Sequence, residues 1–213
     1  MFNYSEAEQQ VAEFLLQIKA IKLQPNNPFT WASGWKSPIY CDNRITLSHP
    51  TARTYIRQQL TQLIQEKFGA VGCIAGVATA GIPQGVLVAQ ELGLPFIYVR
   101  SKPKEHGRGN MIEGDVLTGK RVVVIEDLIS TGKSSLQAVE ALREAGYDVA
   151  GLAAIFTYEF DIATENFNEA KCPFVTLSNY SALIKYAEQN QYITPDDAAL
   201  LKQWRENPSV WGQ

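Results

Sequence analysis

The chain has 213 residues, of which 46% are hydrophobic and 19% charged, so it can bury one sizeable globular core and is not a disordered chain. Its net charge of -3 argues against a protein that coats nucleic acid by bulk electrostatics, so an anionic ligand must be met by local groups. The three cysteines are widely spaced and form no C-x-x-C pair, which favours reduced thiols over a disulfide framework or a zinc site.

The amino-terminal part of the chain predicts two helices around an irregular segment. Residues 5–8 (SEAE) predict a capping box, and apolar residues follow at helical spacing as far as Ile18. Residues 25–43 are rich in proline, glycine, asparagine and aromatic side chains, which predicts an ordered, irregular segment with short strands. A second helix is expected over about 48–67, and Gly69 ends it.

From residue 71 onward, short apolar strands alternate with helices. This pattern predicts an α/β fold with a parallel sheet that is buried on both faces. The expected strands are 71–77, 96–100, 121–126, 149–156 and 174–177, and the expected helices are 82–92, 132–145, 181–190 and 195–206. Residues 100–119 show no apolar periodicity, and compact domains rarely keep so long a loop without a functional use.

The chain shows no internal repeat, so we expect a single domain over 1–213. No stretch approaches 18 consecutive apolar residues, and the first ten residues carry carboxylates where a signal peptide needs positive charge. These features predict a cytoplasmic protein that has no membrane partner.

The strand at 121–126 runs into a near-match to a nucleotide-binding loop. Residues 132–134 (GKS) match the end of the P-loop pattern, in which another glycine stands five positions before the second glycine. That position is Asp127, whose carboxylate would repel a phosphate group. A P-loop nucleotide site is therefore excluded.

Glu126 and Asp127 are instead expected where ligands of open α/β sheets collect, outside the carboxyl end of a strand. Carboxylates are good acceptors for paired sugar hydroxyls. The following turn, 129–134, leads into a helix, so its free N–H groups and its hydroxyls form an anion cradle. Carboxylates for a ribose beside amides for a phosphate predict a ribose-phosphate site.

The predicted loop that follows the 96–100 strand concentrates positive charge. Within residues 100–108 a single acid, Glu105, stands against Arg100, Lys102, Lys104 and Arg108. This excess on a glycine-punctuated loop predicts a mobile lid over a strongly anionic group such as pyrophosphate. His106 lies among these cations, so a bound polyanion would favour its protonation.

Four stretches resemble motifs of known enzymes. Residues 122–134 (VVVIEDLISTGKS) resemble the 5-phosphoribosyl diphosphate (PRPP) motif of type I phosphoribosyltransferases. Residues 104–107 (KEHG) resemble the core of the flexible catalytic loop of orotate phosphoribosyltransferases, and 29–44 (FTWASGWKSPIYCDNR) resemble the segment that closes over the base in that family. Residues 76–83 (GVATAGIP) look like its pyrophosphate loop, in which glycine permits close approach.

The resemblance implies the type I phosphoribosyltransferase fold, with a mostly parallel central sheet flanked by helices. Residues 1–45 would form an N-terminal helix and a base-covering hood, and residues 100–119 would form a mobile catalytic loop. The implied reaction moves a 5-phosphoribosyl group from PRPP to orotate. Mg²⁺ would serve as the cofactor, held mainly by substrate and water without direct protein ligands, in a homodimer whose loops cross between subunits.

The resemblance also assigns roles to individual residues. Catalysis would involve Lys104, His106 and Asp127. PRPP would be bound by Arg100, Lys102, Lys104, His106, Glu126, Asp127, Leu128, Ile129, Ser130, Thr131, Gly132, Lys133 and Ser134. Orotate would be bound by Ser130, Lys36 and Tyr40.

Some positions depart from the family pattern. Ala32 and Ala80 occupy positions where lysines are common, and Tyr158 occupies a position where some members have an arginine near the base. Ser101 stands where many members have a lysine, which leaves the cross-subunit contact to Lys102.

Two alternatives share the PRPP motif. A purine phosphoribosyltransferase should lack the SGWKSP segment at 33–38. A PRPP-sensing regulator adds a basic DNA-binding module at its amino terminus, but only about twenty residues precede the base-binding segment here. We therefore expect no nucleic-acid partner.

Overall fold

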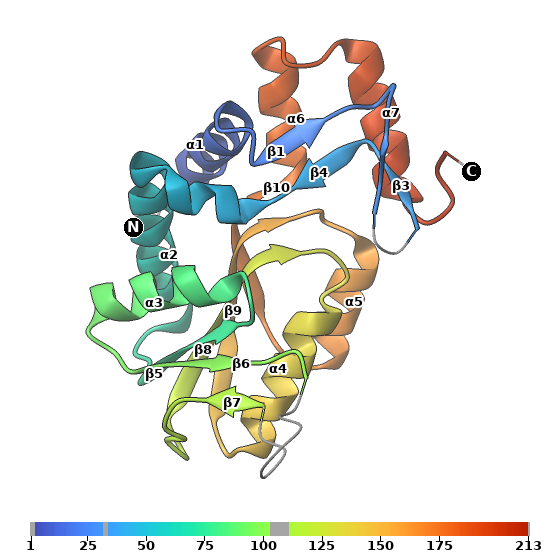
Figure 1. The fold of residues 1–213 in the computed structure, drawn as a ribbon. Helices are drawn as coiled ribbons and strands as arrows, with labels where there is room; N and C mark the ends of the chain where they lie inside the picture. Colours follow the sequence, from blue (N-terminus) through green and yellow to red (C-terminus); the bar gives the residue numbers. More distant parts are fainter. Residues whose placement is uncertain (1–2, 32–33, 103–110, 213) are drawn as a thin grey trace.

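A computed structural model describes residues 3–31, 34–102 and 111–212, and these build a six-stranded sheet in the order β10-β9-β8-β5-β6-β7 (Figure 1). The strands are β5 (Cys73–Val77), β6 (Phe96–Val99), β7 (Ile112–Glu113), β8 (Arg121–Ile129), β9 (Asp148–Thr157) and β10 (Phe174–Asn179). Neighbouring strands pair in parallel except for β6 and β7. The predicted α/β fold with a mostly parallel sheet is confirmed.

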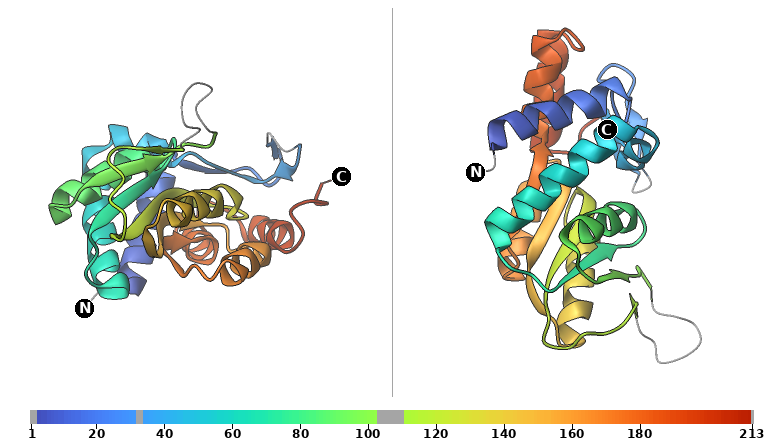
Figure 2. Two further views of the ribbon diagram at one scale, coloured as in Figure 1. Left: turned by 90° about the horizontal axis from the view of Figure 1, so that it is seen from below. Right: turned by 90° about the vertical axis from the view of Figure 1, so that its left-hand side faces the viewer.

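Helices cover both faces of this sheet. They are α1 (Tyr4–Gln17), α2 (Pro50–Phe68), α3 (Gly81–Leu92), α4 (Lys133–Glu144), α5 (Asp161–Glu169), α6 (Tyr180–Gln189) and α7 (Pro195–Glu206). In β8, Val123 and Ile125 pack with α1, α2 and α3, whereas Val122 and Val124 pack with α4 and α5. Figures 1 and 2 show these two groups of helices on opposite sides of the sheet. Burial on both faces explains why the strands form continuous apolar runs in the sequence.

Two elements lie where the sequence pattern predicts none. In α5 only Ala163 and Phe167 are buried, and two apolar residues are too few to show a helical period. The loop expected over 100–119 contains the two-residue strand β7, which pairs antiparallel with Tyr98 and Val99. A strand of two residues is too short to show alternation.

The helix ends also differ in detail from the prediction. The cap of α1 is Asn3, whose Oδ1 accepts from the main-chain nitrogen of Glu6 at 3.3 Å, so the capping box expected at 5–8 is wrong. A capping box does start α7, where Thr194 and Asp197 exchange hydrogen bonds. In the described part of the chain, no helix is both long and apolar enough to cross a membrane.

Strand β8 extends further than the predicted strand at 121–126. It pairs with β9 as far as Ile129, whereas its pairing with β5 stops at Ile125, because β5 itself ends at Val77. The acidic pair, Glu126 and Asp127, therefore lies inside β8, in the part that pairs with β9 but no longer with β5.

The segment between α1 and α2 forms a hood of short strands, as predicted for residues 25–43. Strand β1 (Ile21–Leu23) pairs with β4 (Ile39–Cys41), and β2 (Phe29–Thr30) pairs with β3 (Lys36–Ser37), before the 3-10 helix η1 (Asn43–Ser48). Trp31 anchors the hood to α7, because its ring lies 5.6 Å from that of Trp204. Its Nε1 also donates to the main-chain oxygen of Ile39 at 3.2 Å.

Candidate active site

The strand order reverses at β5, and open α/β sheets bind ligands at the carboxyl edge beside such a reversal. From β5 the chain continues to β6 on one side, while β8 lies on the other side, so the loops that follow β5 and β8 diverge. The start of α3 lies against β8, because a Cβ added at Gly81 would collide with the main-chain oxygen of Ile125. Glycine is thus needed here to pack α3 on β8, a contact within the protein that the sequence pattern does not predict.

The acidic pair lies near the carboxyl end of β8, and its two members have different surroundings. Glu126 is only 6% exposed, and its carboxyl group accepts from the main-chain nitrogen of Asp127 at 3.0 Å and from Ser135 Oγ at 3.1 Å. Burial, followed by the nearby charge of Asp127, raises the pKa of Glu126 well above its ordinary value. Burial also raises the pKa of Asp127, whose side chain is less enclosed. Asp127 is therefore the acid better placed to meet a ligand.

A buried amide, Asn43, holds the main chain at this pair. The residue is 2% exposed, and its Nδ2 donates to the main-chain oxygen of Asp127 at 2.7 Å. Thr46 Oγ1 donates to the main-chain oxygen of Asn43 at 2.6 Å and accepts from Gln84 Nε2 of α3 at 3.3 Å. No motif assigns Asn43 a role, and its only signal in the sequence is its place at the end of the base-covering segment.

The turn after β8 has the geometry of an anion cradle. Gly132 has a φ of 79° and caps α4, which begins at Lys133 without a side-chain cap. The first-turn N–H groups of α4 are therefore available to an anion. Asn166 of α5 donates to the main-chain oxygen of Thr131 at 2.9 Å and steadies the turn. A cavity of about 330 Å³ opens here, lined by Leu128, Ser130, Thr131, Gly132, Lys133, Ser134, Ser135 and Gln137.

A second cavity, of about 320 Å³, lies between the hood and the sheet. It is lined by Thr30, Trp31, Tyr40, Cys41, Leu128, Ser130 and Tyr158. Leu128 and Ser130 line both cavities, so the two adjoin. The rings of Trp31 and Tyr158 lie 5.3 Å apart and give the second cavity an aromatic wall suited to a flat ring.

Two polar side chains of the hood cavity have clear protonation states. Burial, with a smaller effect of Cys41, raises the pKa of Tyr158 well above its ordinary value, so its hydroxyl keeps its proton. Burial likewise raises the pKa of the Cys41 thiol, with added repulsion from Asp127. Cys41 and Thr30 lie within the segment 29–44, but the sequence pattern assigns them no individual role.

The structure brings most of the residues predicted for orotate and the phosphate together. Ser130 and Tyr40 line the hood cavity, and Lys36 reaches it through Thr30, whose Oγ1 accepts from Lys36 Nζ at 2.9 Å. Ile129 differs from the rest, because its side chain is fully buried in the core and faces neither cavity.

The predicted loop residues are only partly described. Arg100 lies beside Glu113, with 3.4 Å between Nη1 and Oε1, and Lys102 is exposed. Lys104 and His106 lie outside the described residues, so their predicted catalytic role stays a prediction.

Comparison with known proteins identifies the family of the chain. Residues 47–189 match the model of the family described as "Phosphoribosyl transferase domain". The chain is 58% identical over 204 residues to the orotate phosphoribosyltransferase of Phocaeicola vulgatus, and the match covers 96% of each protein.

Solved structures give the same result. The orotate phosphoribosyltransferase of Aeropyrum pernix has a TM-score of 0.73 and 26% identity, over 86% of this chain and 99% of that one. The UMP synthase of Leishmania donovani has a TM-score of 0.80 and 25% identity, over 96% of this chain. This chain spans only 43% of the length of that synthase.

A phosphoribosyltransferase domain accounts for the strand order and for the acidic strand followed by a hydroxyl-rich turn. Within that class the relative from P. vulgatus is informative, because the similarity covers nearly the whole chain rather than the shared domain alone. The chain belongs to the orotate phosphoribosyltransferase family.

Proposed function

We propose that this protein transfers the 5-phosphoribosyl group of PRPP to N1 of orotate, releasing pyrophosphate and forming orotidine 5′-monophosphate in pyrimidine biosynthesis. The observation that carries this proposal is the pair of adjoining cavities, with Asp127 directly before their shared wall at Leu128. One cavity offers amides to a phosphate, and the other offers aromatic faces to a flat base. The sugar would then lie between them, beside the acid.

The turn and the acidic strand would hold the donor. The N–H groups and hydroxyls of residues 130–134 would bind the 5′-phosphate. Asp127 would accept from the ribose hydroxyls, and Glu126, held by Ser135, would fix the strand behind it. Binding energy spent on the distant phosphate would then position the reacting carbon of the sugar.

The acceptor would lie under the hood. Tyr40, Ser130 and Tyr158 border the cavity, and Lys36 approaches it through Thr30. We propose that hydroxyl groups and Lys36 meet the carboxylate of orotate. A protonated Tyr158 is a suitable donor for it.

Breaking the bond between the sugar and pyrophosphate develops positive charge on the ring and negative charge on the leaving group. We propose that Asp127 stabilises the charge on the ring, with Glu126 supporting the strand behind it. We assign the leaving group to Arg100, Lys102, Lys104 and His106, because a cluster of cations stabilises charge that develops on an oxyanion. Closure of this loop would also exclude water from the donor.

Magnesium fits this site as an ion carried by the substrate. In residues 3–31, 34–102 and 111–212 no group of three or more His, Cys, Asp or Glu side chains could hold a metal. Glu126 already accepts two hydrogen bonds from the protein, so Asp127 is the carboxylate able to accept from a metal-bound water. This suits Mg²⁺, which keeps several waters and takes oxygen ligands from phosphates. When bound, the ion would neutralise charge that develops on pyrophosphate.

The direct test is to mix the purified protein with PRPP, Mg²⁺ and one base at a time, and to measure nucleotide formation by chromatography. Orotate should give orotidine 5′-monophosphate, whereas adenine, guanine and xanthine should give no nucleotide. Turnover with a purine but not with orotate would refute the proposal.

We further propose that the active form is a cytoplasmic homodimer that shares its catalytic loops.

A further inference from the structure

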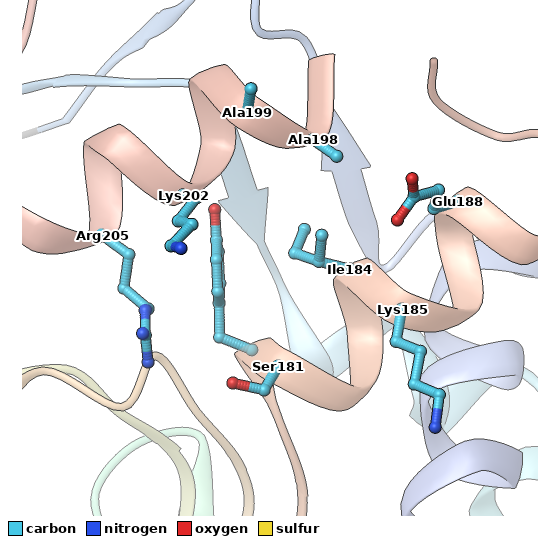
Figure 3. A pocket seen from close by; sticks show the side chains of 9 residues that line it. Ser181, Ile184, Lys185, Glu188, Ala198, Ala199, Lys202 and Arg205 are labelled. Atoms are coloured by element: carbon cyan, nitrogen blue, oxygen red, sulfur yellow. The ribbon is translucent and has the colours of Figure 1, made fainter. Parts of the chain in front are cut away.

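A third and larger cavity, of about 460 Å³, lies between α6 and α7, apart from the candidate active site (Figure 3). None of its lining residues lines the phosphate cavity or the hood cavity. Its volume falls within the range of small-molecule sites, about 300–1,000 Å³. The transfer reaction proposed above does not use this space.

Charged side chains lie at both ends of this cavity. Lys202 and Arg205 project from α7 at one end, and Ile184 and Ala198 lie between that end and Glu188 of α6 (Figure 3). Lys185 of α6 also lines the cavity, on the same side as Glu188 (Figure 3). The cavity therefore has two cations at one end, an apolar middle, and one acid with one further cation at the other end.

The charge at the cationic end is not neutralised within the protein. Lys202 has no hydrogen-bond or ion-pair partner among the residues that the structure describes. Arg205 approaches Glu159 only loosely, with 3.7 Å between Nη1 and Oε2. Glu159 in turn accepts from the main-chain nitrogen of Ser181 at 2.8 Å and from Ser181 Oγ at 2.5 Å. An anion that enters the cavity would therefore meet the unpaired ammonium group of Lys202 and could replace Glu159 as the partner of Arg205.

The wall of the cavity is preformed. Tyr180 is 2% exposed, its hydroxyl donates to the main-chain oxygen of Leu201 at 2.8 Å, and its ring lies 5.6 Å from that of Trp204. These contacts fix α6 to α7 from inside the core. A ligand would not have to order this wall, which lowers the entropy lost on binding.

We propose that the α6–α7 cavity is a second binding site, for a small aromatic anion. The anionic group, a phosphate, sulfonate or carboxylate, lies between Lys202 and Arg205. The flat ring lies against Ile184 and Ala198, and a hydrogen-bond donor at the far end of the molecule meets Glu188. Charge-assisted hydrogen bonds at one end and apolar contact in the middle select this class over inorganic anions.

Fluorescence titration with 5-aminonaphthalene-1-sulfonate tests the site, because this compound has all three features. The full-length protein should bind it saturably. Lys202→Gln should weaken binding about tenfold, and Ala198→Phe should abolish it by filling the middle of the cavity. Lys120→Gln is the matched control, because it removes the same charge from an exposed position at the amino end of β8 and should leave the affinity unchanged. Circular dichroism would show that each variant is folded.

The contact with Glu188 has its own test. Naphthalene-1-sulfonate, which lacks the amino group, should bind the unaltered protein more weakly than its amino derivative. In Glu188→Ala the two compounds should bind equally. A change in the stability of the variant does not affect this test, because the affinities of the two compounds are compared within each protein.

Three outcomes would overturn the proposal. Binding that survives both Lys202→Gln and Ala198→Phe would place the compound elsewhere. Displacement by PRPP would place it in the candidate active site. Lys202-dependent self-association that blocks the compound would show that a second copy of the chain covers the cavity. Because none of these measurements uses the transfer reaction, they fail or succeed independently of the proposed function.

Discussion

Glu126 and Asp127 are adjacent in the sequence, yet the structure gives them separate tasks. Glu126 is tied to Ser135 of α4 and to the next main-chain nitrogen, so it links β8 to the helix that follows the cradle. Asp127 is less enclosed, and its main-chain oxygen is held by Asn43. One acid therefore supports the turn, and the other is left for a ligand.

The raised pKa of Glu126 predicts a pH dependence of stability. Between its ordinary pKa of 4.5 and the raised value in the fold, the folded protein binds more protons than the unfolded chain, so the free energy of unfolding falls as pH rises. Denaturant unfolding from pH 5 to pH 8 should show this decline, and Glu126→Gln should reduce its slope. Glu140→Gln, on the exposed face of α4, should retain the slope of the unaltered protein, and a flat profile in the unaltered protein would contradict the raised pKa.

Replacing Asn43 tests whether this residue positions Asp127 for its ligand or only packs in the core. Asn43→Ala leaves the main-chain oxygen of Asp127 without its donor, at a cost of about 1–3 kcal/mol for a buried unsatisfied group. If Asn43 positions Asp127, calorimetric titration should also show PRPP affinity reduced by roughly tenfold, which is about 1.4 kcal/mol. A variant that is less stable but binds PRPP normally would make Asn43 a packing residue only.

The control for this prediction is Asn26→Ala. Asn26 lies in the hood, and its Nδ2 also donates to a residue distant in sequence, Asp197 Oδ1 of α7, at 2.9 Å. This hydrogen bond lies on the exposed surface. This substitution should change neither PRPP affinity nor, by more than about 0.5 kcal/mol, the stability.

At the scale of elements, the turn between β8 and α4 depends on one glycine for two reasons. Gly132 has a φ of 79°, and a Cβ there would lie 2.6 Å from Cε2 of Phe167. Gly119 has the same φ of 79° but open space around it. The two positions therefore separate backbone strain from steric contact.

Replacing each of these glycines by alanine should give unequal losses of stability. Gly119→Ala should cost about 1 kcal/mol, the penalty for a side chain in the left-handed region. Gly132→Ala should cost more, because Phe167 must also move. Because Phe167→Leu is itself destabilising at a buried position, the test is that Gly132→Ala costs less in a Phe167→Leu background than in the unaltered protein. Thermal unfolding of the three single variants and of the double variant measures these differences. Equal losses at the two glycines would show that the contact with Phe167 is relaxed without cost.

The elements that the sequence predicts well are those with long apolar patterns. The continuous apolar runs of β8 and β9 locate the sheet, and the helical apolar periodicity of α2 locates one of the helices that pack on it. The end of β8 could not be located, because it depends on where β5 stops and β9 continues, which is a property of pairing. Strand β7 and helix α5 bury too few residues to produce a pattern.

At the scale of the whole molecule, the site divides into a contiguous part and an assembled part. The acidic pair, the turn and Ser135 lie within ten residues of one another, so a local motif reveals them. Asn43 reaches Asp127 across a sequence separation of 84 residues. Tyr158 meets Trp31 only because both pack against Trp204 of α7. Such contacts follow from the sheet order and the placement of the hood, and no local pattern carries them.

The proposed sharing of loops predicts complementation between two inactive variants. Lys104→Ala should remove the leaving-group cation and lower turnover far more than it lowers stability, whereas Asp127→Asn should remove the ribose contact. If the loop of one subunit completes the site of its partner, a heterodimer of the two variants contains one site with both unaltered residues. Random exchange of subunits then makes half of the dimers mixed, so activity should recover to about one quarter of the unaltered level.

The predicted recovery of activity requires the two variants to exchange subunits. As a control, each variant is crosslinked before mixing, so that its subunits cannot exchange. That mixture should stay inactive. Sharing of loops requires the active site to contain residues of two chains, so the activity of a tandem-tagged, purified heterodimer decides the matter. An inactive heterodimer would mean that each subunit uses its own loop. Every site in that heterodimer would then lack either Lys104 or the Asp127 carboxylate, so no mixture could restore turnover.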